Sequence, residues 1–281
     1  MLTSQAVKAV HQALQAIFSD SVVLLGGSYW TGEATDTSDL DFYILRPFWH
    51  FFVYKWHLPA VEKLKRDHSG VTINCMVVPR FFYERGWYFV AGETVNGEIW
   101  QSPLNTKIVF RSAIKLTYWN YILFLTAAEP AEKQFALTKM AQHLTVARVV
   151  LTPAELPANG LTASFLIECL PTDQVWNPVR NLLLAKQTGQ LFPVSELEAF
   201  STGLFLLAER LFADNPGYWG FSWVNYIIYN SKFFRHKNTL FLFKNPDKMI
   251  VDCLREGLKN QTDLGRLREE MRTIIFPVIM I

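Results

Sequence analysis

Two short groups of residues near the N-terminus have the types and the spacing that phosphate and metal chemistry needs. Gly26, Gly27 and Ser28 follow an apolar run, and Asp39 and Asp41 open the next one. Glycines let backbone amides approach a polyphosphate closely, and a serine hydroxyl can donate to a phosphate oxygen. Two carboxylates at i and i+2 of a strand lie on one face, about 7 Å apart along the chain, and can share Mg²⁺ ions. Together the two groups suit phosphoryl or nucleotidyl transfer.

Two strands are expected to position these groups. Residues 22–25 are fully apolar and end at two glycines, which indicates a buried strand followed by a tight turn. Residues 39–45 alternate in polarity, as a half-buried strand does. The alternation places Asp39, Asp41 and Tyr43 on one face, so both carboxylates point the same way. The opposite face receives Leu40, Phe42 and Ile44.

The rest of the chain indicates an α+β fold. A helix precedes the first strand, another follows Pro59, a strand spans residues 71–79, and residues 97–101 form a further short strand. From Asn105 onward the segments are long and helical in period. The sequence therefore predicts a small mixed-sheet domain at residues 1–104 and an all-helical domain at residues 105–281. The expected helices of the second domain lie around residues 108–125, 132–151, 161–170, 179–186, 195–212 and 248–258.

Composition and charge exclude several classes of protein. The chain has 281 residues with 27 basic and 25 acidic side chains, and a net charge of +2 argues against a strongly polybasic nucleic-acid binder. Cys75, Cys169 and Cys253 lie far apart without a C-x-x-C pair, which argues against a zinc ribbon or a disulfide framework and favours the reducing cytoplasm. No apolar stretch reaches the roughly 20 residues that cross a bilayer, so we expect no membrane span.

Other nucleotide and metal motifs are absent from the sequence. The segment after the first strand, GGSYWTGEA, lacks the third glycine of a Rossmann site and the lysine of a P-loop. The six histidines show no H-E-x-x-H or paired spacing, which argues against a zinc site. Metal-dependent glycosyltransferases also carry D-x-D, but in parallel-sheet domains with several strands before it. One helix and one strand precede the motif here.

The segment from Leu24 to Leu45 resembles the nucleotidyltransferase superfamily, which includes DNA polymerase β, poly(A) polymerases and aminoglycoside nucleotidyltransferases. The resemblance covers about 100 residues, a common domain size. It implies that nucleotide phosphates contact Gly26, Gly27 and Ser28, and that the catalytic aspartates Asp39 and Asp41 bind Mg²⁺ or Mn²⁺. It rests on Gly26, Gly27, Ser28, Gly32, Ser38, Asp39 and Asp41.

One position departs from the family pattern. The family places a third carboxylate on a following strand, and the matching strand here offers Asn74, which cannot act as a base and is a weaker, neutral metal ligand. Three outcomes stay open: activity survives on two aspartates, another acid substitutes, or the domain binds nucleotide without turnover. The candidate substitutes are Glu33, Asp36, Glu93 and Glu98.

The resemblance implies an Mg²⁺-dependent enzyme that moves an NMP group from an NTP, with ATP as the first candidate, to a hydroxyl of an acceptor held between the two domains. The modest charge favours a small-molecule acceptor over nucleic acid. The alternatives are a catalytically degenerate protein that binds nucleotide or a protein partner, and a structural partner without nucleotide affinity. A basic and aromatic tract at residues 229–244, together with Lys139 and Arg148, can be read either as phosphate contacts or as solvated surface.

Overall fold

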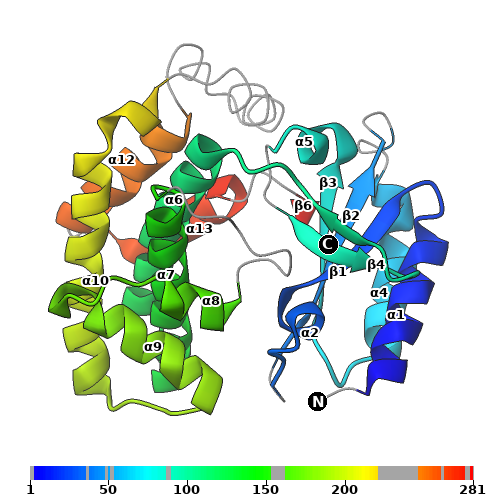
Figure 1. Cartoon of the computed structure of the whole chain (residues 1–281), viewed down its shortest axis with the longest axis horizontal. Coiled ribbons are helices and arrows are strands. Elements are labelled where there is room, and N and C mark those ends of the chain that lie inside the picture. Colours follow the sequence, from blue (N-terminus) through cyan, green and yellow to red (C-terminus); the bar gives the residue numbers. More distant parts are fainter. Residues whose placement is uncertain are drawn as a thin grey trace. The chain divides into compact units, whose positions relative to one another are not determined.

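The computed structural model describes residues 3–35, 38–47, 50, 54–86, 90–152, 162–220, 246–260, 263–275 and 279–280. The chain divides into two compact units. The sheet unit comprises the residues up to Asn105 and the strand β6 (Ile279–Met280), and the helical unit runs from Thr106 to α13 (Leu264–Ile275) (Figure 1). The predicted α+β fold is confirmed. We propose that the first domain ends near residue 104 and that it also includes β6, which belongs to the sheet unit.

The sheet unit is built on a mixed six-stranded sheet of order β5-β4-β1-β2-β3-β6. The pair β2–β3 runs parallel, and the other described pairs run antiparallel. The parallel pair needs a crossover, which α4 provides. The elements of this unit are α1 (Ser4–Ile17), β1 (Val22–Gly26), α2 (Gly27–Thr31), β2 (Leu40–Arg46), η1 (Tyr54–His57), α4 (Leu58–Asp67), β3 (Ile73–Pro79), α5 (Arg80–Glu84), β4 (Ala91–Thr94), β5 (Ile99–Gln101) and β6.

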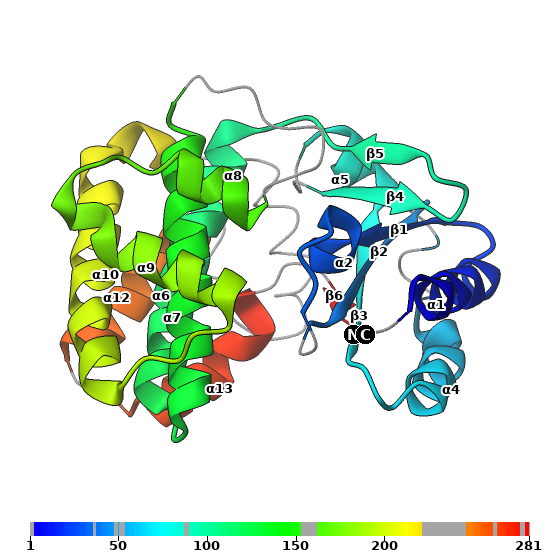
Figure 2. The same cartoon turned by 60° about the horizontal axis from the view of Figure 1, so that its bottom comes forward.

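The helices α1 and α4 cover one face of the sheet, while α2 lies on the other side, next to β1 and β2 (Figure 2). The apolar stripe of α1 packs on alternate residues of the strands, and burial of each such side chain contributes about 1.5–3 kcal/mol. In β2 the buried positions are Leu40, Phe42 and Ile44, so the residues between them face away from α1 and α4. The polar side of β2 is thereby directed to the face that carries α2.

The helical unit is organised around two long neighbours, α6 and α7. Within α6, Lys115 is almost fully buried, and its Nζ lies 3.1 Å from Oδ1 of Asp247 in α12. A buried charge requires such a partner, because an isolated ion in a protein interior is costly. The elements of this unit are α6 (Thr106–Thr126), α7 (Pro130–Val149), α8 (Ala163–Glu168), η2 (Gln174–Trp176), α9 (Asn177–Thr188), α10 (Val194–Asp214), η3 (Pro216–Trp219), α12 (Pro246–Lys259) and α13.

Two helices begin before the residue that local spacing favours as a cap. Ser4 is of a residue type that caps helices, but in α1 the cap is Thr3, whose side chain accepts from the amide of Ala6, and Ser4 is already helical. Ser195 and Glu198 have the spacing of a capping box, whereas α10 begins at Val194 after Pro193 and has no side-chain cap.

Among the helices that the structure describes, none combines the length and the apolar character of a membrane span.

Candidate functional site

The strand register gathers the expected site on one face of the sheet. Gly26 at the end of β1 lies opposite Asp41 of β2, and Asp41 lies opposite Asn74 of β3. Residues directly opposite one another on neighbouring strands share a face. Gly26, Asp41 and Asn74 therefore form a row across three adjacent strands, on the side away from α1 and α4. Asp39 precedes β2, two residues before Asp41, and falls on the same side.

The backbone at Gly27 passes unusually close to Asp41. Gly27 has φ = 63°, a left-handed conformation that favours glycine. A Cβ atom placed on Gly27 would lie 2.3 Å from Oδ2 of Asp41, which is shorter than real Cβ contacts. Two separate features therefore favour glycine at position 27: its positive φ angle, and the carboxylate of Asp41 in the place of a side chain. The structure brings the glycine turn and the acidic pair together.

Ser28 and Ser38 shape the backbone on either side of this contact. Ser28 is the second residue of α2, and its carbonyl accepts from the amide of Glu33 at 2.9 Å, so the chain turns back at once after β1. The hydroxyl of Ser38 accepts from the amide of Thr35 at 2.8 Å, and the amide of Ser38 donates to the carbonyl of Thr35 at 3.1 Å. Ser38 thus closes a small turn immediately before Asp39.

Both aspartates converge on one amide group. The Nδ2 atom of Asn74 donates to Oδ2 of Asp39 and to Oδ1 of Asp41, at 3.2 Å in each case. All three side chains are partly exposed. The amide hydrogens offset the repulsion between two carboxylates that lie within reach of the same atom. A face with two converging carboxylates, open to solvent, is what a divalent cation requires.

The oxygen donors present fit Mg²⁺ or Mn²⁺. Mg²⁺ is usually bound through one or two carboxylates together with substrate phosphates and water, rather than by an all-protein cage. Asp39 and Asp41 supply these carboxylates, and the space beside Gly27 that a Cβ would fill lets backbone lie next to the pair. Within the described part of the chain, no group of three or more Asp, Glu, His or Cys residues could hold a metal ion.

The structure does not bring Glu33, Glu93 or Glu98 to the pair as a third acid, since no such group of three forms. Glu93 of β4 lies opposite Leu25, which packs on the core under α1, so Glu93 is on the other face of the sheet. Glu98 is exposed at the β4–β5 turn, where it accepts from Nε1 of Trp100 at 3.4 Å. Asp36 lies outside the described residues.

Sequence reasoning named Tyr43 only as a neighbour of the acids, and the structure makes it part of the surroundings of the site. Its ring covers Gly26, where a Cβ would lie 2.3 Å from Cε2 of Tyr43. Desolvation, and secondarily the charge of Asp41, raises the pKa of Tyr43 to about 12. Tyr43 is therefore a neutral phenol near pH 7 and does not serve as a base there. The period-two alternation was the signal that could have singled it out.

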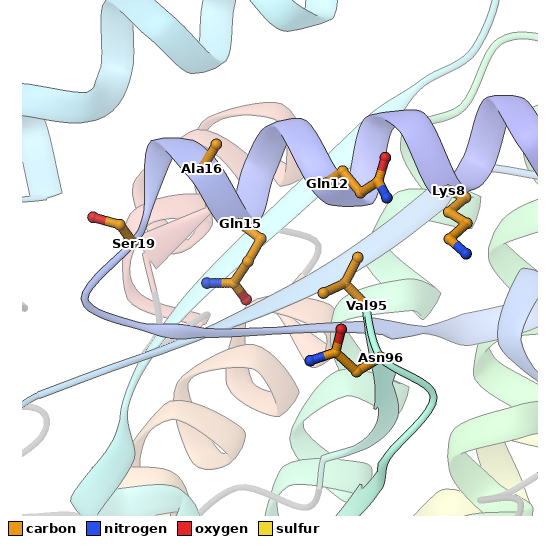
Figure 3. A pocket seen from close by; sticks show the side chains of 7 residues that line it. All are labelled: Lys8, Gln12, Gln15, Ala16, Ser19, Val95 and Asn96. Carbon is orange, nitrogen blue, oxygen red and sulfur yellow. The ribbon is translucent and has the colours of Figure 1, made fainter.

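A groove elsewhere in the sheet unit has a volume of about 480 Å³ and lies between α1 and the β4–β5 turn. Figure 3 shows Val95 and Asn96 of that turn beneath the side chains of α1. One lining side chain, Gln15, is engaged in the fold: it donates to the carbonyl of Ser21 at 2.9 Å and accepts from the amide of Val23 at 3.2 Å. None of the expected site residues lines this groove.

The remaining candidate cations, Lys139 and Arg148, belong to α7 of the helical unit. Lys139 of α7 lies over the ring of Phe135, with Nζ 5.4 Å from its centroid. Burial, and next the charge of Lys139, lowers the pKa of His143 to about 3. Arg148 is in the last turn of α7, where a cation interacts favourably with the helix dipole. These placements are those of helix-surface cations. The tract at residues 229–244 lies outside the described residues.

A comparison with protein families gives one match. The model of the nucleotidyltransferase domain matches residues 7–113. This range contains α1 from Val7 onward, the strands β1 to β5 and the face that carries Asp39 and Asp41. A search of curated proteins found no match to the chain.

Proposed function

We propose that this chain, in which residues 7–113 form a nucleotidyltransferase domain, transfers an NMP group from an NTP, ATP first among the candidates, to a hydroxyl of a small-molecule acceptor. The observation that carries the proposal is the convergence of the Asp39 and Asp41 carboxylates on one point beside Gly27. We assign the catalytic and metal-binding roles to Asp39 and Asp41. The nucleotide-binding roles go to Gly26, Gly27 and Ser28.

The acceptor oxygen forms a bond to the α-phosphorus in this reaction, the bond between that phosphorus and the pyrophosphate breaks, and the hydroxyl proton is released to water. A bound Mg²⁺ or Mn²⁺ would polarise the phosphorus centre, stabilise the charge that develops on pyrophosphate and lower the pKa of the attacking hydroxyl. Asp39 and Asp41 hold carboxylate oxygens at a common place, where both accept from the Asn74 amide while no cation is bound. Gly27 leaves the backbone free to lie beside Asp41, where phosphate oxygens would approach.

The choice of a small acceptor rests on charge. A protein that tracks a nucleic-acid backbone normally presents a clear stripe of basic residues. This chain has a net charge of +2. Of the two candidate cations in α7, Lys139 lies over the ring of Phe135 and Arg148 lies in the last turn of the helix. The three cysteines, Cys75, Cys169 and Cys253, are free, which supports a cytoplasmic setting.

Pyrophosphate release tests the proposal. In the presence of Mg²⁺ and a panel of hydroxylated small molecules, the unmodified chain should release pyrophosphate from ATP. Asp39→Asn and Asp41→Asn should each lower the rate at least about 100-fold, because removal of one metal carboxylate takes away charge stabilisation in the transition state. Circular dichroism should show an unchanged fold. Variants that retain full Mg²⁺-dependent release would contradict the assignment.

The second candidate is a nucleotide-binding protein without turnover, and one observation favours it: Asn74, a group that cannot accept a proton, stands between the two acids. Calorimetry with ATP and Mg²⁺ separates the candidates. Binding together with pyrophosphate release supports the enzyme. Binding without release from any acceptor supports the second candidate.

A further inference from the structure

The amide of Asn74 places partial positive charge beside the carboxylates of Asp39 and Asp41, as a bound cation would. Its Nδ2 atom carries two hydrogens with partial positive charge, and it lies 3.2 Å from an oxygen of Asp39 and 3.2 Å from an oxygen of Asp41. One hydrogen is therefore available for each carboxylate. Hydrogen bonds to ionised acceptors are about twice as strong as neutral ones. A cation that binds to both carboxylates has to replace these two bonds.

The position of Asn74 is fixed by the sheet. Asn74 lies opposite Asp41 in the parallel register of β2 and β3. Its neighbours in the strand, Ile73 and Cys75, are buried in the core on the opposite face. Alternation along β3 therefore directs the Asn74 side chain to the carboxylates, and the strand cannot slip without moving Ile73 and Cys75 out of the core.

The charge of the site is also lower than three carboxylates would give. Asn74 is neutral, and within the described residues no third acid joins Asp39 and Asp41. The affinity of an oxygen site for a divalent cation depends on the number of charged ligands. Two carboxylates that are already hydrogen-bonded to an amide make a weak site for a free cation. Phosphate oxygens of a bound nucleotide would add the missing negative ligands.

We propose that Asn74 makes cation binding at Asp39 and Asp41 depend on the nucleotide. Without nucleotide, the amide holds the two carboxylates and a free divalent cation binds weakly. When NTP phosphates are present, their oxygens complete the ligand set and the cation displaces the amide. The nucleotide-dependent half of the proposal rests on the proposed function above, whereas the effect of Asn74 on the free cation does not. Asn74 is on this account a positioning residue that controls metal occupancy.

Titration with Mn²⁺, followed by the loss of the free-ion electron paramagnetic resonance signal, tests the first half without nucleotide or turnover. Asn74→Asp should bind Mn²⁺ at least about tenfold more tightly than the unmodified chain, because it replaces a donor with a charged ligand. The matched control is Asn96→Asp, which adds the same charge at an exposed position of the β4–β5 turn. Its affinity should equal that of the unmodified chain. Equal affinities of the two variants would overturn the proposal.

A second variant keeps the test decisive if Asn74→Asp fails to fold. Asn74→Ala removes the amide without adding charge, and it should bind Mn²⁺ at least as tightly as the unmodified chain, since nothing has to be displaced. Weaker binding would show that Asn74 is a ligand rather than a competitor of the cation, and the proposal would fall.

The same titration with α,β-methylene-ATP, which cannot release pyrophosphate, tests the nucleotide-dependent half. The analogue should increase the Mn²⁺ affinity of the unmodified chain by at least about tenfold, and that of Asn74→Asp by less, because a third carboxylate already supplies negative charge. An equal increase in both proteins would contradict the proposal. If calorimetry detects no binding of the analogue, the proposed function fails. The Mn²⁺ affinities of Asn74→Asp and Asn96→Asp without nucleotide still decide the role of the amide in that case.

Discussion

At the scale of single residues, Gly27 combines a left-handed backbone conformation with close contact to Asp41, one of the two proposed metal ligands. Its φ of 63° belongs to the left-handed region, and the carboxylate of Asp41 occupies the place where a side chain would begin. A left-handed residue with a side chain costs about 1–2 kcal/mol, and here the displaced group would be a site carboxylate. A substitution at Gly27 is thus expected to affect stability and activity together.

Gly27→Ala should lower the rate of pyrophosphate release at least about tenfold, because the new methyl group would push Asp41 away from Asp39 and a displacement of 1 Å can cost on the order of 100-fold. The rate is measured with saturating ATP and Mg²⁺, and the free energy of unfolding is measured by denaturant titration.

The matched control for Gly27→Ala is Gly189→Ala. Gly189 ends α9 with φ = 69°, and a Cβ there would meet no atom within 4 Å. The control should lose a similar amount of stability and keep the full rate. A Gly27→Ala variant that is destabilised like the control but fully active would refute the role of the Gly27–Asp41 contact.

At the scale of elements, a hydrogen-bonded network joins three helices of the helical unit. Glu209 of α10 accepts from Tyr118 of α6 at 2.6 Å and from both Nε and Nη2 of Arg255 of α12, at 2.6 and 2.5 Å. The hydrogen bond from Arg255 is the main cause that lowers the pKa of Glu209. The same carboxylate contributes to the raised pKa of Tyr118, after desolvation. The network therefore carries a pH dependence of folding.

The sign of that dependence follows from the lowered pKa of Glu209. A carboxyl group whose pKa is lower in the folded than in the unfolded protein stabilises the fold above the unfolded value, which is 4.5 here, and this stabilisation is lost as the pH falls towards the folded value. Glu209→Gln should flatten the loss of thermal stability below pH 4.5, as measured by melting temperature between pH 3 and 6. Parallel pH profiles of the variant and the unmodified chain would contradict this expectation.

At the scale of the whole molecule, the chain returns to its first unit after the helices. β6 pairs antiparallel with β3, with Met280 opposite Met76 and Ile279 opposite Val77. Without β6, the backbone of β3 would present an unpaired edge, which promotes association between chains. β3 also carries Asn74, so β6 pairs with the strand whose side chain contacts the two proposed metal ligands.

Deletion of residues 279–281 should therefore accelerate amide hydrogen exchange at residues 76–77 by at least about tenfold, equivalent to about 1.4 kcal/mol of local opening free energy. Hydrogen exchange read by mass spectrometry measures this effect. The control replaces Ile279 and Met280 with threonine, a residue with good strand propensity, and should preserve the protection. Unchanged protection in the deletion variant would show that β6 does not stabilise β3.

The local patterns accounted for most of the elements that carry the site. Period-two alternation in residues 39–45 predicted β2, and the apolar run before Gly26 predicted β1. The sequence did not predict β4. The only strand expected in this region spans residues 97–101, which corresponds to β5, and the structure adds β4 at Ala91–Thr94. Short strands with mixed polarity carry little periodic signal, and their existence depends on a partner strand.

The sequence by itself determined that Asp39 and Asp41 point the same way, because the side-chain period of a strand is a local property of the backbone. Only the tertiary structure decided what those carboxylates meet. The register of β1, β2 and β3 put Gly26 and Asn74 beside Asp41, and the return of β6 closed the other edge of β3. Register and strand order depend on contacts between residues far apart in the chain, and no window of neighbouring residues contains that information.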